Sequence, residues 1–372
     1  MNVRLTASGW GLALAALVLT AAGLPADYPE VTALGATAAA LLLAAAVWTS
    51  RRPDVRARRE LRHHRVREGQ PIRCRLVVHN AGTRPSPELE VVDGSGEEPV
   101  RLVLGGMPAQ ASDEVEYQLP TRRRGVYTAP PPTVDLIDPF RLLRRSRRDG
   151  SPDTYYVHPH HRELPGFGAG GPLDIDGEAL TPRRDGSAFY SLRPYVPGDE
   201  RRLIHWPSTA RTGELVVRHL SAPDAPECLV VLDTTATPYA DGRFEEAVRV
   251  TASLCVSALD SGARLTLRTT GDLELRCTTR AEHGEPLDFL AGVDIAPQRL
   301  SWAQAVAGDR EWSSALVVSG TLAAAEVGKI AAAGRPVLVV QLGATPFSTR
   351  GVSGATVVTT RTCAEFADHW NG

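Results

Sequence analysis

Two long apolar runs near the start of the chain constrain its fold more than any other feature. The first extends from Leu5 to Leu24 and the second from Val31 to Thr49, and neither contains a charged residue. A run of about 20 apolar residues is long enough to cross the hydrocarbon core of a bilayer as a helix. Residues 25–30 (PADYPE) contain two prolines that interrupt a helix and allow only a tight return. The sequence therefore predicts a two-helix transmembrane hairpin over residues 1–52.

The arginines that follow the second run predict the orientation of this hairpin. Arg51, Arg52, Arg56, Arg58 and Arg59 lie just after it, whereas the link between the runs has no basic residue. Basic residues are enriched on the cytoplasmic side of membrane helices. We therefore expect a two-span protein of the cell membrane with its soluble domains in the cytoplasm. The alternative is that the first run is a signal peptide, cleaved in an alanine-rich stretch, which would leave one span.

The soluble part begins with a segment that has the pattern of a β-protein. Between residues 59 and 160, short runs with period-two alternation are separated by Gly, Pro, Ser and Asp. This pattern predicts a β-sandwich-like domain, with one buried and one solvated face on each sheet. Residues 161–184 are rich in glycine and proline and have little apolar periodicity, which is typical of a linker.

The last part of the chain, residues 224–372, alternates buried strands with amphipathic helices. Apolar runs at 228–233 and 336–343 alternate with helical patterns at 244–262 and 321–334. Such an order predicts a mainly parallel sheet with helices on both faces, which is a doubly wound α/β domain. Ligands of these domains usually bind at the carboxyl ends of the strands. We therefore expect a multi-domain protein with a transmembrane hairpin, an all-β module and an α/β domain.

Charge and cysteine content argue against several classes of function. The 372 residues carry a formal net charge of −2, so nothing indicates nucleic acid as the main partner. The five cysteines form no C-x-x-C pair, and this predicts neither a disulfide framework nor a zinc knuckle. The sequence also has no phosphate-binding loop, no G-x-S-x-G nucleophile elbow and no H-E-x-x-H motif. An ATP-driven role would therefore need a partner that binds the nucleotide.

Residues 185–220 combine aromatic and charged residues without a period of 2 or 3.6, which indicates a segment held by polar contacts. We call this segment the signature. Its most specific residues are Arg193, Tyr195, Gly198, Asp199, Arg202, His205, Trp206, Arg211 and Arg218. With Arg124-Gly125 and Asp138-Pro139-Phe140 upstream, the signature resembles domain-of-unknown-function family fifty-eight.

This resemblance implies a fold and a partner over nearly the whole chain. Members of the family are membrane proteins whose C-terminal part is similar to von Willebrand factor A domains, and residues 224–372 would correspond to that part. They are commonly linked to MoxR-type AAA+ ATPases, as partners in the assembly or maturation of other proteins. The resemblance therefore implies a MoxR-type ATPase as the protein partner.

The signature itself allows two interpretations. A turn at Gly198 and Asp199, arginine side chains with planar donor groups, and a large surface at Trp206 predict a structural clasp or a docking surface. Alternatively, Asp199 and His205 are the acid–base pair of a hydrolase, because histidine titrates near neutrality and a carboxylate can orient it. The sequence shows no nucleophile with its oxyanion donors, so we favour the docking surface.

A second candidate site follows the first strand of the α/β domain. Residues 233–237 (DTTAT) resemble the metal-ion-dependent adhesion motif D-x-S-x-S, with Asp233, Thr235 and Thr237 in the ligand positions. Such a site binds Mg²⁺ through oxygen ligands and needs a second Asp after a later strand. That strand ends here in Ser319-Gly320 without an Asp. We therefore expect a degenerate site with weak or no Mg²⁺ binding.

Together these features predict a membrane-anchored, non-enzymatic interaction or scaffold protein that has no cofactor and works with a MoxR-type AAA+ ATPase. Two alternatives stay open. One is a hydrolase that uses His205 and Asp199. The other is a metal-dependent, adhesion-type binding protein that uses Asp233.

Overall fold

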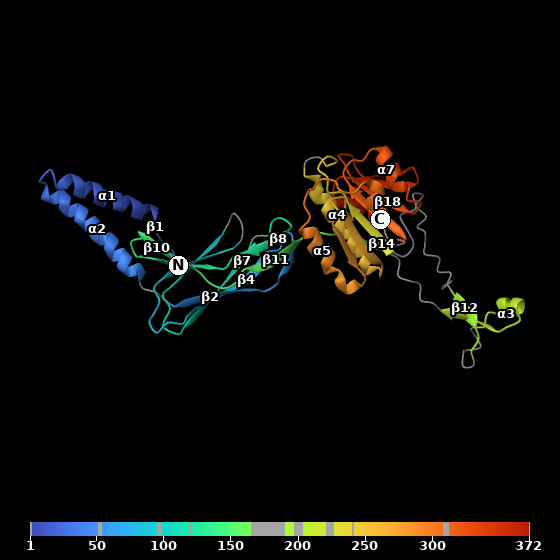
Figure 1. The fold of residues 1–372 in the computed structure, drawn as a ribbon, viewed down its shortest axis with the longest axis horizontal. Helices are drawn as coiled ribbons and strands as arrows, with labels where there is room; N and C mark the ends of the chain where they lie inside the picture. The colour runs from blue at the N-terminus through green and yellow to red at the C-terminus, as the bar shows by residue number, and fades with distance from the viewer. Residues whose placement is uncertain are drawn as a thin grey trace. The chain divides into compact units, whose positions relative to one another are not determined.

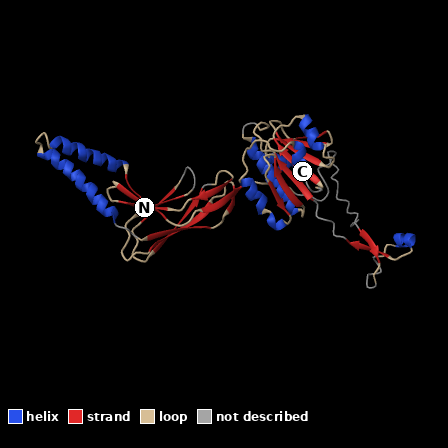
Figure 2. Ribbon diagram, viewed as in Figure 1, coloured by secondary structure: helices blue, strands red, loops and turns tan. Residues whose placement is uncertain are grey.

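The computed structural model of the chain consists of two compact units, Met1–His158 and Pro159–Gly372 (Figure 1). Figure 2 distinguishes the helices and strands within each unit. Each unit has its own hydrophobic core. The structure describes residues 2–50, 54–94, 99–119, 121–164, 190–196, 204–220, 227–239, 242–307 and 312–371.

Two helices, α1 (Ala7–Gly23) and α2 (Pro29–Ser50), run side by side at the start of the first unit (Figure 1). α2 is long and apolar enough to cross a membrane, whereas α1 is shorter, at 17 residues. The predicted first span, at about residues 5–24, includes Leu5, which belongs to a strand. Thr6 ends that strand and caps α1, since its hydroxyl oxygen accepts a hydrogen bond from the Gly9 amide at 3.0 Å.

The two helices pack closely at small residues. A Cβ atom at Gly35 would lie 2.8 Å from the amide nitrogen of Thr20 and 3.2 Å from the carbonyl oxygen of Ala16. A Cβ atom at Gly11 would meet no atom within 4 Å. Gly35 therefore lies in the helix–helix interface, where a missing side chain lets the two backbones approach each other, and Gly11 lies outside it.

The base of the hairpin is joined to the strands of the first unit. β1 (Asn2–Leu5) pairs antiparallel with β10 (Leu143–Arg148), so the residues that precede α1 belong to a sheet. At the end of α2, the Arg145 guanidinium donates a hydrogen bond to the Thr49 carbonyl at 2.8 Å. A helix leaves its last carbonyls without intrahelical partners, and Arg145 satisfies one of them. A single strand, β10, thus holds both ends of the hairpin.

The rest of the first unit is an all-β module, as the alternating pattern predicts. Its other strands are β2 (Val55–Leu61), β3 (Arg65–Arg67), β4 (Ile72–Asn80), β5 (Leu89–Asp93), β6 (Val100–Leu104), β7 (Ser112–Leu119), β8 (Gly125–Ala129), β9 (Thr133–Ile137) and β11 (Asp153–His158). They form sheets in the orders β1-β10-β9-β5-β6, β2-β4-β7 and β3-β11-β8. Alternate side chains of β4 are fully buried, and strands from all three sheets contribute to one apolar core.

A buried ion pair lies inside this module. The Arg59 guanidinium is 2.5 Å from the Asp93 carboxylate and 2.9 Å from that of Asp153, and the Arg59 side chain is only 1% exposed. The Tyr117 hydroxyl also donates to Asp93, and burial, reinforced by this carboxylate, raises the pKa of the phenol. Arg59 therefore belongs to the core of the module. Its charge is paired with two carboxylates in the folded module, and its part in orienting the hairpin stays a prediction.

The second unit includes the start of the predicted linker. Leu164 is buried in the core of this unit, and the Arg162 amide donates to the Ser253 hydroxyl on α4 (Arg243–Asp260) at 3.0 Å. Residues 161–164 therefore pack against α4 and do not act as a linker. The remainder of the predicted linker, residues 165–184, lies outside the described residues.

The centre of the second unit is a seven-stranded sheet. Its strands are β14 (Glu227–Leu232), β15 (Arg264–Thr269), β16 (Glu274–Cys277), β17 (Ser314–Ser319), β18 (Val337–Leu342), β19 (Ser348–Val352) and β20 (Ala355–Thr360). Their order is β16-β15-β14-β17-β18-β20-β19. The five inner strands are parallel, and the two edge strands are antiparallel to their neighbours. The prediction of a mainly parallel sheet is confirmed.

Helices cover both faces of this sheet. Val230 of β14 packs in one core with residues of α4, α5 (Gly284–Ala291) and α8 (Cys363–Trp370). The next residue, Val231, packs in a second core with residues of α6 (Trp302–Val306) and α7 (Ala324–Ala331). Successive side chains of a strand point to opposite faces, so a strand buried on both sides has a continuous apolar sequence. This explains the unbroken run at 228–232.

The signature contains a small two-stranded sheet. β12 (Tyr190–Pro194) and β13 (Val216–Leu220) pair antiparallel, and α3 (Trp206–Thr212) lies between them in the chain. The amide of Tyr195 donates to the carbonyl of Leu215 at 2.8 Å, which extends the pairing beyond β12.

Candidate functional site

The direction in which strands are added to the sheet reverses at β14. β15 pairs with one edge of β14 and β17 with the other. In open parallel sheets, ligands bind at this switch point, outside the carboxyl ends of the strands. A cavity of about 600 Å³ lies there, and we call it the switch-point cavity. Its lining includes Asp233, Thr235, Thr237, Ile295, Trp302 and Glu326.

Asp233, the first residue after β14, forms the polar floor of this site and is 1% exposed. Its Oδ1 accepts hydrogen bonds from the Thr235 amide at 3.0 Å, the Thr235 hydroxyl at 2.7 Å and the Thr270 hydroxyl at 3.1 Å. Its Oδ2 accepts one from the Ser319 hydroxyl at 2.6 Å. All four donors are neutral groups. The carboxylate is therefore held by hydrogen bonds on both of its oxygens.

Two members of this network, Thr270 and Ser319, were missed by the sequence reasoning as partners of Asp233. Both are fully buried. Thr270 follows β15, and Ser319 is the last residue of β17, so they lie at the carboxyl ends of the two strands that flank β14. A polar residue at the end of each apolar run was a usable signal, but only the strand order shows that these ends are neighbours.

Contacts of Tyr239 and Gly320 also hold the loop after β14 in place. The Tyr239 hydroxyl donates to the Asp233 carbonyl at 2.6 Å, and burial, with Asp233 nearby, raises the pKa of this phenol well above its ordinary value. Gly320 lies against the carbonyl of Pro238, where any side chain would collide, and the Thr321 amide donates to the same carbonyl at 3.0 Å. The wall of the cavity is therefore formed before any ligand arrives.

The donor set around Asp233 does not fit a Mg²⁺ site of the adhesion type. Ser319 stands at the end of β17, where the resemblance would require a second Asp, and its hydroxyl is committed to Asp233. The Thr235 hydroxyl is committed to the same carboxylate, while Thr237 is exposed on the cavity wall. The motif contributes one carboxylate, which is too little charge for a hard dication. Glu326, the other acidic residue of the lining, accepts a hydrogen bond from the Ala323 amide at 3.2 Å. Weak or absent Mg²⁺ binding stays a prediction that a binding measurement can test.

The described signature residues lie on β12, α3 and β13 and beside them. Arg193 on β12 pairs with Val217 on β13, and Arg218 on β13 pairs with Leu192, so the two arginines belong to neighbouring residue pairs of this sheet. Three of the predicted residues lie outside the described part of the chain: Gly198, Asp199 and Arg202.

His205 has a structural role that the sequence reasoning did not consider. It is the N-cap residue of α3, and its Nδ1 lies 3.3 Å from the Ser208 amide and 2.8 Å from the Ser208 hydroxyl oxygen. The next residue, Trp206, is 65% exposed, and Arg211 is exposed in the last turn of α3. The proposed pairing of His205 with Asp199 stays a prediction.

The fold and site define a multi-domain protein with an apolar helix pair, an all-β module and an α/β unit that carries a switch-point cavity. Residues 191–292 match the family model described as "Protein of unknown function DUF58". The match confirms the resemblance predicted from the signature. The matched range contains most of the signature and the strands β14, β15 and β16 of the α/β sheet. The upstream motifs at 124–125 and 138–140 lie outside the matched range.

Comparison with curated proteins gives a relative from a bacterium. "Uncharacterized protein YeaD" of Bacillus subtilis (strain 168) is 25% identical over 186 residues, which are 49% of this chain and 45% of the relative. The chain therefore spans less than half the length of this relative.

Among solved structures, similarity is low. A CARDB domain from Pyrococcus furiosus aligns with a TM-score of 0.22 and 11% identity, over 28% of this chain and 91% of that domain. Spo0M, a sporulation control protein from Bacillus subtilis, aligns with a TM-score of 0.19 and 11% identity, over 28% of this chain and 50% of Spo0M. Scores this low support no inference about fold or function.

Proposed function

We propose that this protein is a membrane-anchored interaction protein that binds a segment of another protein in the switch-point cavity. The observation that carries the proposal is the cavity itself, which lies at the switch point of the sheet and has a wall fixed by Asp233, Tyr239 and Gly320. Binding sites combine apolar surface with a few placed polar groups. Here Ile295 and Trp302 supply the apolar surface, and threonine hydroxyls supply the polar groups.

We also propose that the second unit is a von Willebrand A-like domain. The order β16-β15-β14-β17-β18-β20 corresponds to the 3-2-1-4-5-6 order of doubly wound sheets, if β19 is an addition at the edge. The position of Asp233 directly after the central strand supports this assignment, because the adhesion motif of that family begins there.

The membrane anchor is proposed to be the whole hairpin. Large apolar side chains of both helices are 54–67% exposed: Leu14, Leu17, Val18, Leu34, Leu43 and Val47. Leaving such side chains in water costs about 1.5–3 kcal/mol each relative to burial, so a lipid environment is favoured. Trp10, near the start of α1, and Tyr28, at the turn between the helices, are more than 60% exposed and suit the two membrane interfaces.

The topology can be tested at the turn of the hairpin. An Asp27→Cys variant should react with a membrane-impermeant maleimide in intact cells, whereas a reporter fused after Gly372 should have cytoplasmic activity. The native cysteines are all buried, so background labelling should be low. An extracytoplasmic signal from the reporter would contradict the proposed orientation.

A MoxR-type AAA+ ATPase is the proposed partner, on the basis of the family resemblance and the lack of a nucleotide-binding motif in this sequence. Pull-down of the detergent-solubilised protein should recover the ATPase of the same organism when its ATP-bound state is trapped. Ile295→Asp, at a cavity residue that is 53% exposed, should abolish recovery. Val103→Asp, at a 67% exposed residue of β6 in the other unit, is the matched control.

The outcomes separate the two parts of this proposal. Failure of the wild-type protein to recover the ATPase would refute the choice of partner. Equal recovery by Ile295→Asp and Val103→Asp would refute the cavity as the binding surface.

Hydrolysis is a second candidate because Nδ1 of His205 lies 2.8 Å from the Ser208 hydroxyl, a distance suited to a base and its nucleophile. The capping contact to the Ser208 amide explains the same geometry without catalysis. Ser208→Ala should abolish any hydrolase activity while leaving the melting temperature nearly unchanged. Absence of hydrolase activity in the wild-type protein, or activity that persists in Ser208→Ala, would favour the cap, because the Ser208 amide that makes the capping contact remains in this variant.

A further inference from the structure

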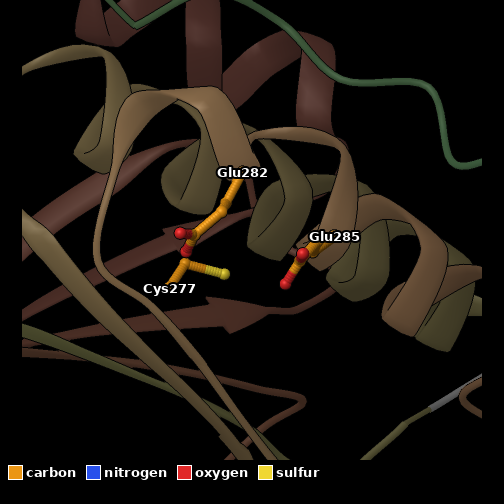
Figure 3. Close-up of side chains that lie close together, drawn as sticks. All are labelled: Cys277, Glu282 and Glu285. Atoms are coloured by element: carbon orange, nitrogen blue, oxygen red, sulfur yellow. The ribbon is translucent and has the colours of Figure 1, made fainter.

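Three side chains with metal-ligand chemistry converge beside the edge strand β16 (Figure 3). Cys277 is the last residue of β16, Glu282 ends the short 3₁₀ helix η2 (Arg280–Glu282), and Glu285 lies in the first turn of α5. The sulfur of Cys277 and one carboxylate oxygen of each Glu all lie within 4.8 Å of one another. This spacing is short enough for one ion to contact all three atoms.

Cys277 differs from Cys74 and Cys363 in its surroundings. It is only 1% exposed, and within the described residues its sulfur makes no hydrogen bond. In contrast, the Cys74 thiol lies 3.8 Å from the Ile72 carbonyl oxygen and the Cys363 sulfur lies 3.5 Å from the Ser253 hydroxyl. Figure 3 shows the Cys277 side chain between the two glutamates. A buried, unpartnered thiol thus points into an acidic cluster.

Glu282 is held by hydrogen bonds from its own segment. Glu282 accepts hydrogen bonds from the Thr278 amide at 2.8 Å and the Thr279 hydroxyl at 2.9 Å. A carboxylate oxygen that accepts one hydrogen bond keeps a lone pair for a further ligand. Arg280, in the same segment, donates instead to Asp260 at 3.0 Å.

We propose that Cys277, Glu282 and Glu285 bind a divalent transition metal ion, for which Zn²⁺ is the best match. A thiolate excludes Mg²⁺ and Ca²⁺, which prefer oxygen ligands, whereas Zn²⁺ accepts sulfur and carboxylate ligands together. Three protein ligands leave the fourth tetrahedral position for water. On binding, the thiol loses its proton to solvent and the sulfur donates its electron pair to the metal.

Such an ion would join the end of β16 to the start of α5. β16 is an edge strand that pairs with the sheet on one side only. The ion would cross-link this edge to the neighbouring helix and stabilise the folded state by mass action. The site uses none of the residues of the switch-point cavity, so it does not depend on the function proposed above.

Titration of the full-length, chelator-treated protein in detergent with Zn²⁺ and with Co²⁺ tests this proposal. One equivalent of Zn²⁺ should bind and raise the melting temperature, and Co²⁺ should give a thiolate-to-metal charge-transfer band in the near ultraviolet. Glu285→Gln changes an exposed residue and should weaken Zn²⁺ binding by about tenfold or more, in line with the loss expected when a metal site is perturbed. Cys277→Ser should remove the band, whereas the control Cys74→Ser should keep it.

Two results would overturn the proposal. One is the absence of Zn²⁺ binding at submillimolar concentration by the wild-type protein. The other is binding that persists unchanged in Glu285→Gln, with a charge-transfer band that does not come from Cys277. Because Glu285 is exposed, its variant stays informative even if Cys277→Ser fails to fold.

Discussion

Replacing Arg59 with leucine should destabilise the β-module strongly, because it would leave a buried carboxylate without its cation. Asp93 has no exposed side-chain surface and Arg59 has 1%, so water cannot replace the lost charge. The Tyr117 hydroxyl and the Gly94 amide would still donate to Asp93, but both are neutral. Breaking one side of a buried ion pair costs about 3–5 kcal/mol. We expect a loss of this size in the free energy of unfolding of the module.

Hydrogen exchange of β4 amides, measured on the full-length protein in detergent, reports this module separately from the second unit. A loss of about 3–5 kcal/mol should speed exchange through global opening by on the order of 10²–10⁴-fold. Arg58→Leu, at the neighbouring outward-facing position with an 82% exposed side chain, should change stability by less than about 0.5 kcal/mol.

A double variant tests the physical reason directly. Arg59→Met combined with Asp93→Leu removes both buried charges and should recover much of the lost stability, since apolar replacements of a buried ion pair are often neutral. Asp153 is 26% exposed and can be solvated in that variant. If Arg59→Leu exchanges no faster than Arg58→Leu, or if the double variant recovers nothing, the argument from an uncompensated buried charge is wrong.

Three further predictions concern other parts of the chain. A hydrogen bond from a neighbouring arginine lowers the pKa of Glu365 to about 2. The contribution of this carboxylate to the free energy of unfolding is therefore complete above pH 4.5 and is lost as the pH falls towards 2. Urea unfolding should show that Glu365→Gln costs about 1 kcal/mol at pH 7 and nothing near pH 2. Gly320→Ala would place a methyl group against the Pro238 carbonyl and should lower the melting temperature by several degrees while weakening partner binding at the cavity. Gly35→Val should separate the helices of the hairpin and lower its thermal stability in micelles, whereas Gly11→Val, with open space around it, should not; equal effects would contradict the assigned interface.

The sequence alone determined those features that local periodicity encodes. Apolar runs of about 20 residues predicted the helical hairpin, although the structure begins its first helix at Ala7, after the capping residue Thr6. Period-two alternation predicted the all-β module, and continuous apolar runs predicted the mainly parallel sheet. The signature predicted the family whose model matches residues 191–292. All of these signals depend on neighbours within one helical turn or one strand.

Only the tertiary structure decided which distant residues meet. Arg59 is one of five arginines between residues 51 and 59, and its burial depends on Asp93 and Asp153 reaching the same point from other strands. In the same way, Asp233 gains Thr270 and Ser319 because β15 and β17 flank β14. A hydrogen bond or an ion pair depends on distance in space, and the order of strands in a sheet sets that distance independently of separation along the chain.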